Sequence, residues 1–248
     1  RLVVLVWGQV PGCDSGGMFA PVCRLQSTRM VLAIAAQYNL ECWQLSYNTA
    51  FLNADVEEEV YVKMTPGYEE FGENRLLMVM RLLKSLYGLH QSLSNWWGII
   101  DEHLAEIGFK SLKSDPRVYF YSESNAIVVL SPYVDDILLL GKDLKVLGRI
   151  KQKLVNHFSM TDMGDVSLVL GMGITRDCTK WTVTISQDNY TKSLLESYGM
   201  ASCNPAYTPA MGKELSLDQP EEKLLNKDDK QRFRAIRASV RYLGEVAR

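Results

Sequence analysis

The chain has 248 residues, of which 47% are hydrophobic, enough to build a core for one large or two small globular domains. Its formal net charge of -2 argues against a wholly basic nucleic-acid binder, although a local basic groove would not show in a sum over the whole chain. Five cysteines without C-x-x-C spacing argue against a disulfide framework and a zinc site, and no apolar run reaches the roughly 20 residues of a membrane span.

Strands and helices alternate irregularly in the first part of the chain. Residues 1–6 form an apolar run that predicts a strand, and because no initiator methionine precedes it we interpret the chain as a piece of a longer protein. A loop rich in Gly, Pro and Ser follows at 11–21. Strands are expected at 43–47 and 60–64, separated by an acidic turn. Before them, helical spacing of apolar residues predicts a helix with one buried stripe, made of Met30, Val31, Ile34, Ala35 and Tyr38.

The middle of the chain centres on the motif Tyr133-Val134-Asp135-Asp136. Apolar strands are predicted directly before it, at 126–130, and directly after it, at 137–140. The pattern of strands and helices here is typical of an α+β fold. The other predicted elements are a helix at 93–107 ending at Gly108, a strand at 118–121, and a helix at 144–158 with Lys145, Arg149, Lys151 and Lys153 outside.

A different composition begins near residue 162 and predicts a subdomain over 162–204. It contains a hairpin with alternating apolar residues within 166–185, followed by a helix at 189–198. Residues 205–226 hold three prolines and few large apolar groups, which is typical of a linker. The last stretch, 227–248, carries seven Lys and Arg against three Asp and Glu.

Two adjacent carboxylates between apolar strands suggest metal chemistry. Burying one anion is costly, and burying Asp135 and Asp136 together without a cation is more so. In two-metal nucleotidyl transfer, carboxylates hold a pair of ions about 3.5–4 Å apart. The alternative is a solvated turn, the commoner fate of an isolated Asp-Asp pair. The apolar strands and the preceding Tyr133 and Val134 favour the metal site.

A series of short motifs accompanies this pair in a fixed order. Before it come Phe19-Ala20-Pro21-Val22, Thr49-Ala50-Phe51-Leu52-Asn53, Glu59-Val60-Tyr61-Val62 and Ser85-Leu86-Tyr87-Gly88-Leu89. After it come Ile137-Leu138, Phe158-Ser159-Met160, Asp162-Met163-Gly164, Leu170-Gly171-Met172 and Ser186-Gln187 with Tyr190. The series resembles, from end to end, the reverse-transcriptase region of Ty1/copia-type retrotransposon polyproteins.

The resemblance implies a right-hand polymerase whose palm carries an antiparallel sheet and the Tyr133–Asp136 hairpin. Fingers and palm would take residues 1–161, a thumb-like subdomain 162–204, and a linker with the start of a truncated connection segment 205–248. The reaction would be RNA- or DNA-templated extension of a primer with deoxynucleoside triphosphates, with Mg²⁺ or Mn²⁺ as cofactor. The partners would be template-primer and nucleotides, with other polyprotein segments as further partners and no membrane. Since no targeting signal is seen, we expect an intracellular, cytoplasmic protein.

The resemblance also implies roles for single residues. Asp135 and Asp136 would be catalytic metal ligands, and a nucleotide pocket would include Tyr87, Gly88, Gln91 and Tyr133. Tyr87 is a plausible packing surface for the nucleotide and Gly88 would allow close backbone approach. The alternative for Tyr87 is a plain core aromatic.

This chain departs from the family at a position that the chemistry needs. The family places a third metal-binding aspartate where this chain has Ser46. A neutral hydroxyl does not replace the charge of a carboxylate that bridges two cations, so we expect polymerase activity to be nearly lost. Asp55 is nine residues further on in a solvated acidic run and is not expected to substitute.

Other departures point in the same direction. Leu5 and Val6 stand where the family has a basic residue and glycine. His90-Gln91-Ser92-Leu93-Ser94 replaces a run containing basic groups and a turn proline. Pro132 stands inside the strand before the aspartates, where it removes a backbone donor and could displace the turn. The three histidines show no ligand spacing and are expected at the surface or in packing roles.

Two hypotheses follow for the function. The first is a reverse transcriptase by descent, with catalysis impaired in this copy. The second is a non-catalytic remnant that binds nucleic acid through the basic face of the 144–158 helix and the basic segment 227–248, unless those charges are ordinary solvated faces.

Overall fold

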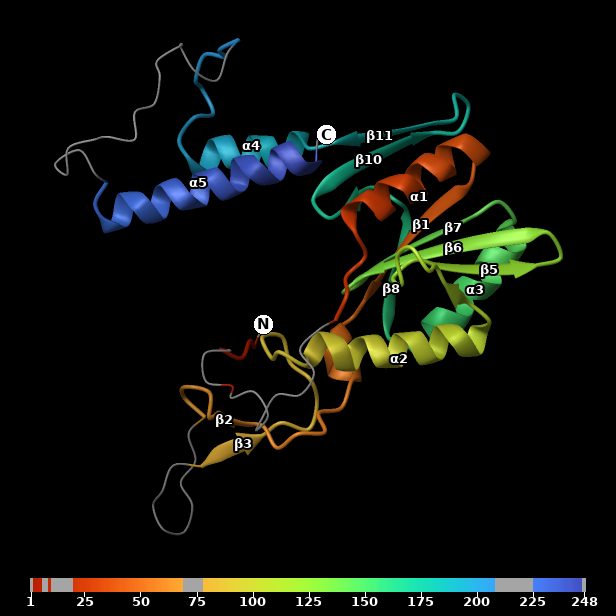
Figure 1. Cartoon of the computed structure of the whole chain (residues 1–248), viewed down its shortest axis with the longest axis horizontal. Coiled ribbons are helices and arrows are strands. Elements are labelled where there is room, and N and C mark those ends of the chain that lie inside the picture. Colours follow the sequence, from red (N-terminus) through yellow and green to blue (C-terminus); the bar gives the residue numbers. More distant parts are fainter. Residues whose placement is uncertain (1, 6–8, 10–19, 69–77, 208–224, 247–248) are drawn as a thin grey trace. The chain divides into compact units, whose positions relative to one another are not determined.

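The computed structural model describes residues 2–5, 9, 20–68, 78–207 and 225–246 (Figure 1). These residues fall into two compact units. The first holds the described residues up to Val166 together with Asp177–Val183, and the second holds Ser167–Arg176 and the described residues from Thr184 onwards. The fold is mixed α+β with antiparallel sheets, which confirms the predicted class. None of the described helices combines the length and apolar character that a membrane crossing requires.

A six-stranded antiparallel sheet in the order β4-β5-β6-β7-β1-β8 forms the centre of the first unit (Figure 1). Helices α2 and α3 cover one face of the sheet, and α1 lies on the other (Figure 1). Because both faces are covered, β7 is apolar and its residues 137–140 are all buried. The strands are β1 (Glu41–Tyr47), β4 (Lys110–Ser111), β5 (Tyr119–Glu123), β6 (Ala126–Tyr133), β7 (Asp136–Gly141) and β8 (Met160–Asp165), and the helices are α1 (Leu25–Tyr38), α2 (Ser92–Ile107) and α3 (Leu144–His157).

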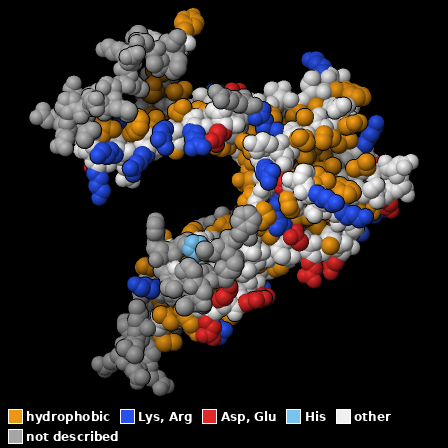
Figure 2. Space-filling view, in the orientation of Figure 1, with side chains coloured by type: hydrophobic (Ala, Val, Ile, Leu, Met, Phe, Trp, Pro, Cys, Tyr) orange, Lys and Arg blue, Asp and Glu red, His pale blue; other side chains and the backbone are white. Residues whose placement is uncertain are grey.

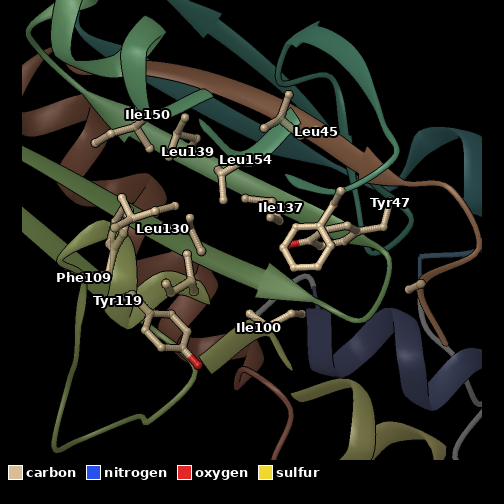
Figure 3. Packing of buried hydrophobic residues seen from close by; sticks show 14 of the residues in the cluster. Leu45, Tyr47, Ile100, Phe109, Tyr119, Leu130, Ile137, Leu139, Ile150 and Leu154 are labelled. Carbon is tan, nitrogen blue, oxygen red and sulfur yellow. The ribbon is translucent and has the colours of Figure 1, made fainter. Parts of the chain in front are cut away.

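The hydrophobic core of the first unit lies between the sheet and helices α2 and α3 (Figure 3). Helix α2 contributes Trp96 and Trp97, whose exposed fractions are 0% and 1%. Alternate residues of β1 and β7 point into the same core, and each fully buried aliphatic side chain stabilises the fold by about 1.5–3 kcal/mol. The sheet residues of this core include Leu45, Val128, Leu130, Ile137 and Leu139, and helix α3 adds Leu147, Ile150 and Leu154.

Helix α1 forms as predicted, but its buried stripe is displaced by about one residue. Met30 and Tyr38, both predicted to be buried, are 65% and 58% exposed. Val31 and Ala35 are buried as predicted, but Met30, Ile34 and Tyr38 recur every four residues along one edge of the apolar face and are exposed. The buried positions are spaced by three, one and three residues and lie on one face, as helical periodicity requires: Thr28, Val31, Leu32 and Ala35.

The predicted strand at residues 1–6 is not found where the structure describes it. Leu2, Val3, Val4 and Leu5 have no regular secondary structure, and residues 1 and 6 lie outside the described part. The Val4 amide donates to the carbonyl oxygen of Tyr87, which belongs to a loop rather than to a strand. Most of the predicted loop at 11–21 also lies outside the described residues.

Some short or polar strands escaped sequence prediction, among them β4 (Lys110–Ser111). The predicted strand at 60–64 exists as β2 (Tyr61–Lys63), and it pairs with the unpredicted β3 (Val79–Arg81) in a separate two-stranded sheet. Strand β8 was missed because five of its six residues are exposed, so its sequence lacks apolar alternation. It is held at the edge of the main sheet by pairing with β1.

Pro132 does not displace the turn that follows it. It lies within β6 opposite Ile137, and pairing continues to Tyr133 and Asp136. The ladder to β5 ends earlier on β6, at Leu130. Tyr133 and Asp136 are the pair that closes the two-residue hairpin. In the adjacent pair, which contains Pro132, the backbone nitrogens point away from the partner strand. The missing donor of Pro132 therefore costs the β6–β7 ladder nothing.

The second unit combines a small sheet with two helices. The sheet has the order β11-β10-β9, and the hydroxyl of Tyr242 in α5 donates to the carbonyl oxygen of Leu170. The Tyr242 ring also packs edge-on against Tyr190 of α4, with ring centroids 5.0 Å apart. Of the predicted linker 205–226, residues 208–224 lie outside the described part. The elements are β9 (Leu168–Val169), β10 (Met172–Asp177), β11 (Thr182–Ser186), α4 (Asp188–Ser197) and α5 (Lys227–Val246).

Stacked histidines join α2 to the end of α3. The rings of His103 and His157 have centroids 3.6 Å apart and an interplanar angle of 19°. Burial lowers the pKa of His103, and the neighbouring His157 lowers it further, whereas Glu106 opposes the shift. Lys153 of α3 lines a surface cavity together with His103 and His157. The folded chain therefore disfavours the charged form of His103.

We expect the free energy of unfolding to fall as the pH decreases through the ordinary histidine pKa of roughly 6.5. In this range the unfolded chain binds more protons at His103 than the folded chain does, so stability is lost toward acid. Urea unfolding at about pH 5.5 and about pH 7.5 checks this, and His103→Gln should reduce the difference between the two values. The exposed His90 provides the control variant His90→Gln. An unchanged difference in His103→Gln would contradict the assignment.

Candidate active site

The paired aspartates lie where β6 turns into β7. Tyr133 pairs with Asp136, so Val134 and Asp135 form a two-residue turn. Val134 has a φ of 54°, in the left-handed region that β-branched residues rarely adopt, and strain of this kind costs about 1–3 kcal/mol. The indole nitrogen of Trp96 donates to the Val134 carbonyl oxygen at 3.0 Å. Helix α2 thus holds the strained turn in place.

Ser46 lies directly opposite Asp136 on the adjacent strand β1. Opposite residues of an antiparallel pair share one face of the sheet, so the serine hydroxyl stands beside the carboxylate. Burial raises the pKa of Asp136, and the charge of Asp135 raises it further. Hydrogen bonds from the side chains of Ser46 and Gln44 act in the opposite direction. The Asp136 carboxylate is therefore a desolvated anion that neutral donors only partly stabilise.

The Asp135 side chain is bound by a tyrosine hydroxyl. The Tyr87 hydroxyl lies 2.7 Å from one carboxylate oxygen of Asp135 and 2.8 Å from the other. The Tyr87 ring packs against Phe51 with ring centroids 4.5 Å apart. On the backbone side, the Tyr47 amide donates to the Asp135 carbonyl oxygen at 2.6 Å. Both the side chain and the main chain of Asp135 are thus fixed by neighbouring elements.

The donor set fits a divalent ion held by two carboxylates. Asp135 and Asp136 are adjacent, partly buried anions, and the raised pKa of Asp136 is relieved by a nearby cation. Carboxylate oxygens are the ligands that Mg²⁺ and Mn²⁺ prefer. Among the described residues, however, His, Cys, Asp and Glu form no group of three or more suited to a metal ion. Asp55 is instead paired with Lys84 at 2.7 Å.

Gly88 has a steric role that the structure makes plain. Its φ is +102°, and a Cβ at this position would lie 2.0 Å from the carbonyl oxygen of Val4. The close backbone approach that the sequence led us to expect is therefore made by Val4. The amide of Val4 also donates to the Tyr87 carbonyl oxygen at 2.9 Å, which fixes the backbone next to the tyrosine that binds Asp135.

Gln91 and Tyr133 lie in different surroundings. Gln91 is 1% exposed, donates to Glu58 at 3.3 Å and accepts from Gln9 at 3.0 Å. These contacts tie the start of α2 to two other segments. Tyr133 closes the β6–β7 hairpin opposite Asp136 and is half-buried. The structure thus brings Tyr87 and Tyr133 to the paired aspartates and gives Gln91 a network of its own.

The sequence matches the model of the family described as reverse transcriptase (RNA-dependent DNA polymerase) over residues 1–212. The chain belongs to this reverse transcriptase family. The reverse transcriptase domain is 39% identical over 214 residues to the retrovirus-related Pol polyprotein from transposon TNT 1-94 of Nicotiana tabacum, covering 86% of this chain and 16% of that protein. It is 33% identical over 244 residues to the Pol polyprotein from transposon RE1 of Arabidopsis thaliana, covering 98% of this chain and 16% of that protein.

The reverse transcriptase domain is of the copia/Ty1 type. It is also 33% identical over 147 residues to the Transposon Ty1-GR3 Gag-Pol polyprotein of Saccharomyces cerevisiae, covering 59% of this chain and 8% of that protein. The chain thus spans 16% or less of the length of these three relatives. A solved structure of apo telomerase from Candida tropicalis gives a TM-score of 0.37 at 9% identity, covering 66% of this chain and 39% of that chain.

Several residues that shape the site in the reverse transcriptase domain were not predicted. The indole of Trp96 in α2 donates to the turn, the Gln44 side chain forms a hydrogen bond with Asp136, and the Phe51 ring packs against the Tyr87 ring. Gln44 had a detectable signal, because it lies two residues from Ser46 on the same strand and so shares its face. Trp96 and Phe51 act across distances in sequence that periodicity does not reveal.

Proposed function

We propose that the chain is the polymerase core of a copia-type retroelement and that its catalysis is impaired at Ser46. It would extend a primer 3′ hydroxyl with deoxynucleoside triphosphates on an RNA or DNA template. The pairing of Ser46 with Asp136 carries the proposal. Opposite residues have Cβ atoms about 4.5–5.5 Å apart, so a carboxylate at position 46 would stand beside the aspartate pair. The hydroxyl present there lacks the charge that a second cation needs.

Asp135 and Asp136 would hold Mg²⁺ or Mn²⁺, and the bound ion would neutralise negative charge on the reacting phosphate. The residues of the chain itself would position and orient. Tyr87 borders the aspartates, and its ring rests on Phe51, which supports a place in the nucleotide pocket. Gly88 and Gln91 would shape that pocket indirectly, through the backbone of Val4 and the network at the start of α2.

The proposed subdomains follow the family pattern. Residues 1–161 would form fingers and palm, 162–204 a thumb-like part, and 205–248 a linker with the start of a connection segment. In support, the first compact unit contains the six-stranded sheet, and the aspartate hairpin lies in the middle of that sheet. The β6–β7 hairpin would then be the catalytic hairpin of the palm.

Primer extension tests the proposal directly. The purified chain is given a primed RNA or DNA template, all four deoxynucleoside triphosphates and either Mg²⁺ or Mn²⁺, and product is resolved by length. We expect incorporation close to the level of an Asp135→Asn/Asp136→Asn control. Efficient extension by the unaltered chain, well above that control, would show that Ser46 does not impair catalysis.

A second candidate function, binding to nucleic-acid phosphates, is favoured by helix α5. Five of its cations follow spacings of three and four residues, which places them on one helix face. All five are exposed, and Figure 2 shows Lys and Arg side chains in a row along this helix. We call this face the basic stripe: Lys227, Lys230, Arg234, Arg237 and Arg241.

Helix α3, the other predicted basic surface, is less suited to bind phosphate. Arg149 forms an ion pair with Glu123. Lys151 pairs with Asp162 at 2.7 Å and lies over the Trp43 ring, 4.4 Å from its centroid. Two of the four outward cations of α3 therefore form ion pairs within the chain. Among the described residues, the basic stripe has one ion pair, between Arg241 and Glu245.

Replacing three cations of the basic stripe, as Lys230→Gln/Arg234→Gln/Arg237→Gln, is expected to weaken binding of duplex DNA regardless of sequence. The slope of log affinity against log salt is negative, and each lost phosphate contact reduces its magnitude by about 0.9. Losing three contacts therefore makes the slope less steep by roughly 2–3. Fluorescence anisotropy across a salt series measures the slope. The triple variant Lys145→Gln/Arg149→Gln/Lys153→Gln on α3 removes the same charge and should change the slope less. Equal effects of the two variants would remove the case for α5.

A further inference from the structure

We propose that the Tyr87 hydroxyl caps Asp135 in the ion-free chain and competes with a divalent ion for that carboxylate. This inference rests on the proposed metal-binding role of Asp135 and Asp136. It goes beyond that role by naming the side chain that opposes the ion. Tyr87 would thus be a positioning residue that sets how tightly the hairpin binds its ion.

The geometry of the contact is that of a cap. The hydroxyl lies 2.7 Å from one oxygen of Asp135 and 2.8 Å from the other, so one donor is shared by both. A phenol has a single proton, which points at the edge of the carboxylate between its two oxygens. A cation bound to the same carboxylate meets the positive end of this O–H dipole. The two ligands therefore repel each other, and occupancy by one weakens the other.

The position of Tyr87 is enforced by three neighbouring elements. Its ring packs on Phe51, with centroids 4.5 Å apart. Its carbonyl oxygen accepts from the Val4 amide at 2.9 Å, and Val4 in turn fills the space beside Gly88. The Ser92 hydroxyl donates to the carbonyl oxygen of Leu86 at 2.6 Å, immediately before Tyr87. The cap is consequently held in place rather than left to an exposed, freely rotating side chain.

The neighbouring carboxylate of Asp136 is also stabilised by hydrogen bonds from neutral side chains. Asp136 receives hydrogen bonds from Ser46 and Gln44, which are neutral donors. In the ion-free chain, neutral donors from three different positions thus stabilise two adjacent carboxylates. Tyr87 differs from the other two because its hydroxyl lies within hydrogen-bond distance of both oxygens of one carboxylate.

Manganese binding to Tyr87→Phe tests the inference, because this variant keeps the ring on Phe51 and removes the hydroxyl alone. Titration of Mn²⁺, followed by the electron paramagnetic resonance signal of the free ion, should show about tenfold tighter binding, equivalent to about 1.4 kcal/mol. The measurement is made in the unaltered chain and in the Ser46→Asp background, where a third carboxylate brings the affinity into a measurable range. Unchanged affinity in the Ser46→Asp background would overturn the inference.

Thermal unfolding separates a cap from a purely structural contact. Without ion, Tyr87→Phe should unfold about 3–6 °C below the unaltered chain, the shift that corresponds to about 1.4 kcal/mol in a chain of this size, because a hydrogen bond to a charged group is lost. In saturating Mn²⁺ the gap should close, because the ion has already displaced the hydroxyl. A gap of the same size with and without Mn²⁺ would overturn the inference.

Two control variants complete the experiment. Tyr121 also donates its hydroxyl to a carboxylate, Glu123, at 2.7 Å, away from the hairpin. Tyr121→Phe should leave Mn²⁺ affinity unchanged, and equal tightening by both variants would count against the cap. In an Asp135→Asn background, Tyr87→Phe should lose its effect, and a persistent effect would contradict the assignment to Asp135.

The outcomes for the cap and for the proposed polymerase differ. If Ser46→Asp gains no primer extension but Tyr87→Phe binds Mn²⁺ more tightly, the cap stands and the proposed impairment at Ser46 fails. If Ser46→Asp becomes active and Tyr87→Phe binds Mn²⁺ as before, the cap alone is overturned. Absence of Mn²⁺ binding in every variant would overturn the cap together with the metal-binding role of the hairpin.

Discussion

Replacing Ser46 with aspartate is expected to raise primer extension by about three orders of magnitude. A carboxylate at this position restores the charge that holds a second cation, and metal stabilisation of transition-state charge is worth several kcal/mol. The site accommodates the change, because Ser46 is half-buried and pairs with Asp136 across two adjacent strands. Single-nucleotide incorporation rates, measured with Mg²⁺ for both proteins, give the ratio.

The matched control for this prediction is Ser46→Asn, which has nearly the size of aspartate but no charge. It should give no more primer extension than the unaltered chain. Adding Asp136→Asn to Ser46→Asp should abolish the gain. If Ser46→Asp is folded and still inactive, the cause lies elsewhere, and the first candidates are Leu5, which is 76% exposed, and the segment that starts α2.

Trp96→Ala is expected to lower the free energy of unfolding by about 3–5 kcal/mol, the usual range for truncating a large buried aromatic. Trp96 is 0% exposed and packs edge-on against Tyr47 and Phe158, with ring centroids 4.7 and 5.4 Å away. It also donates to the Val134 carbonyl oxygen, so its loss removes a support of the strained turn. Urea denaturation of the whole chain measures the effect.

Trp96→Phe divides that effect into packing and hydrogen bonding. The phenyl ring keeps much of the contact with Tyr47 and Phe158 but leaves the Val134 oxygen without its donor, and we expect a loss of about 1–2 kcal/mol. Trp181, which is 55% exposed, gives the matched control Trp181→Ala with little effect. A loss below about 1 kcal/mol for Trp96→Ala would show that the core does not depend on this side chain.

Sequence patterns predicted those parts of the fold in which burial follows a simple period. The strands beside the aspartate pair and helices α2, α3 and α4 were found within a few residues of their ends, because their apolar residues recur every two or every three to four positions. The strand β8 could not be found in this way. It is an exposed, polar edge strand whose place depends on pairing with β1 rather than on its own composition.

The candidate site was only partly predictable for a related reason. The neighbourhood of Asp135 and Asp136 follows from one local motif, whereas the partners of each carboxylate come from distant segments. Tyr87 lies 48 residues before Asp135, and its contact with that side chain depends on the packing of several loops. The backbone of Val4 beside Gly88 is a further example, since the predicted strand at 1–6 gave no sign that it would pack there.

The pairing of Ser46 with Asp136 bears on how such a domain tolerates sequence change. Like charges gathered at a catalytic site repel one another and lower the stability of the fold, and this is the usual origin of a trade-off between stability and activity. A carboxylate at position 46 would repel the carboxylate of Asp136, whereas the serine hydroxyl forms a hydrogen bond with it. Selection on folding alone would therefore not disfavour a serine at this position, and the architecture would persist even where the chemistry is lost.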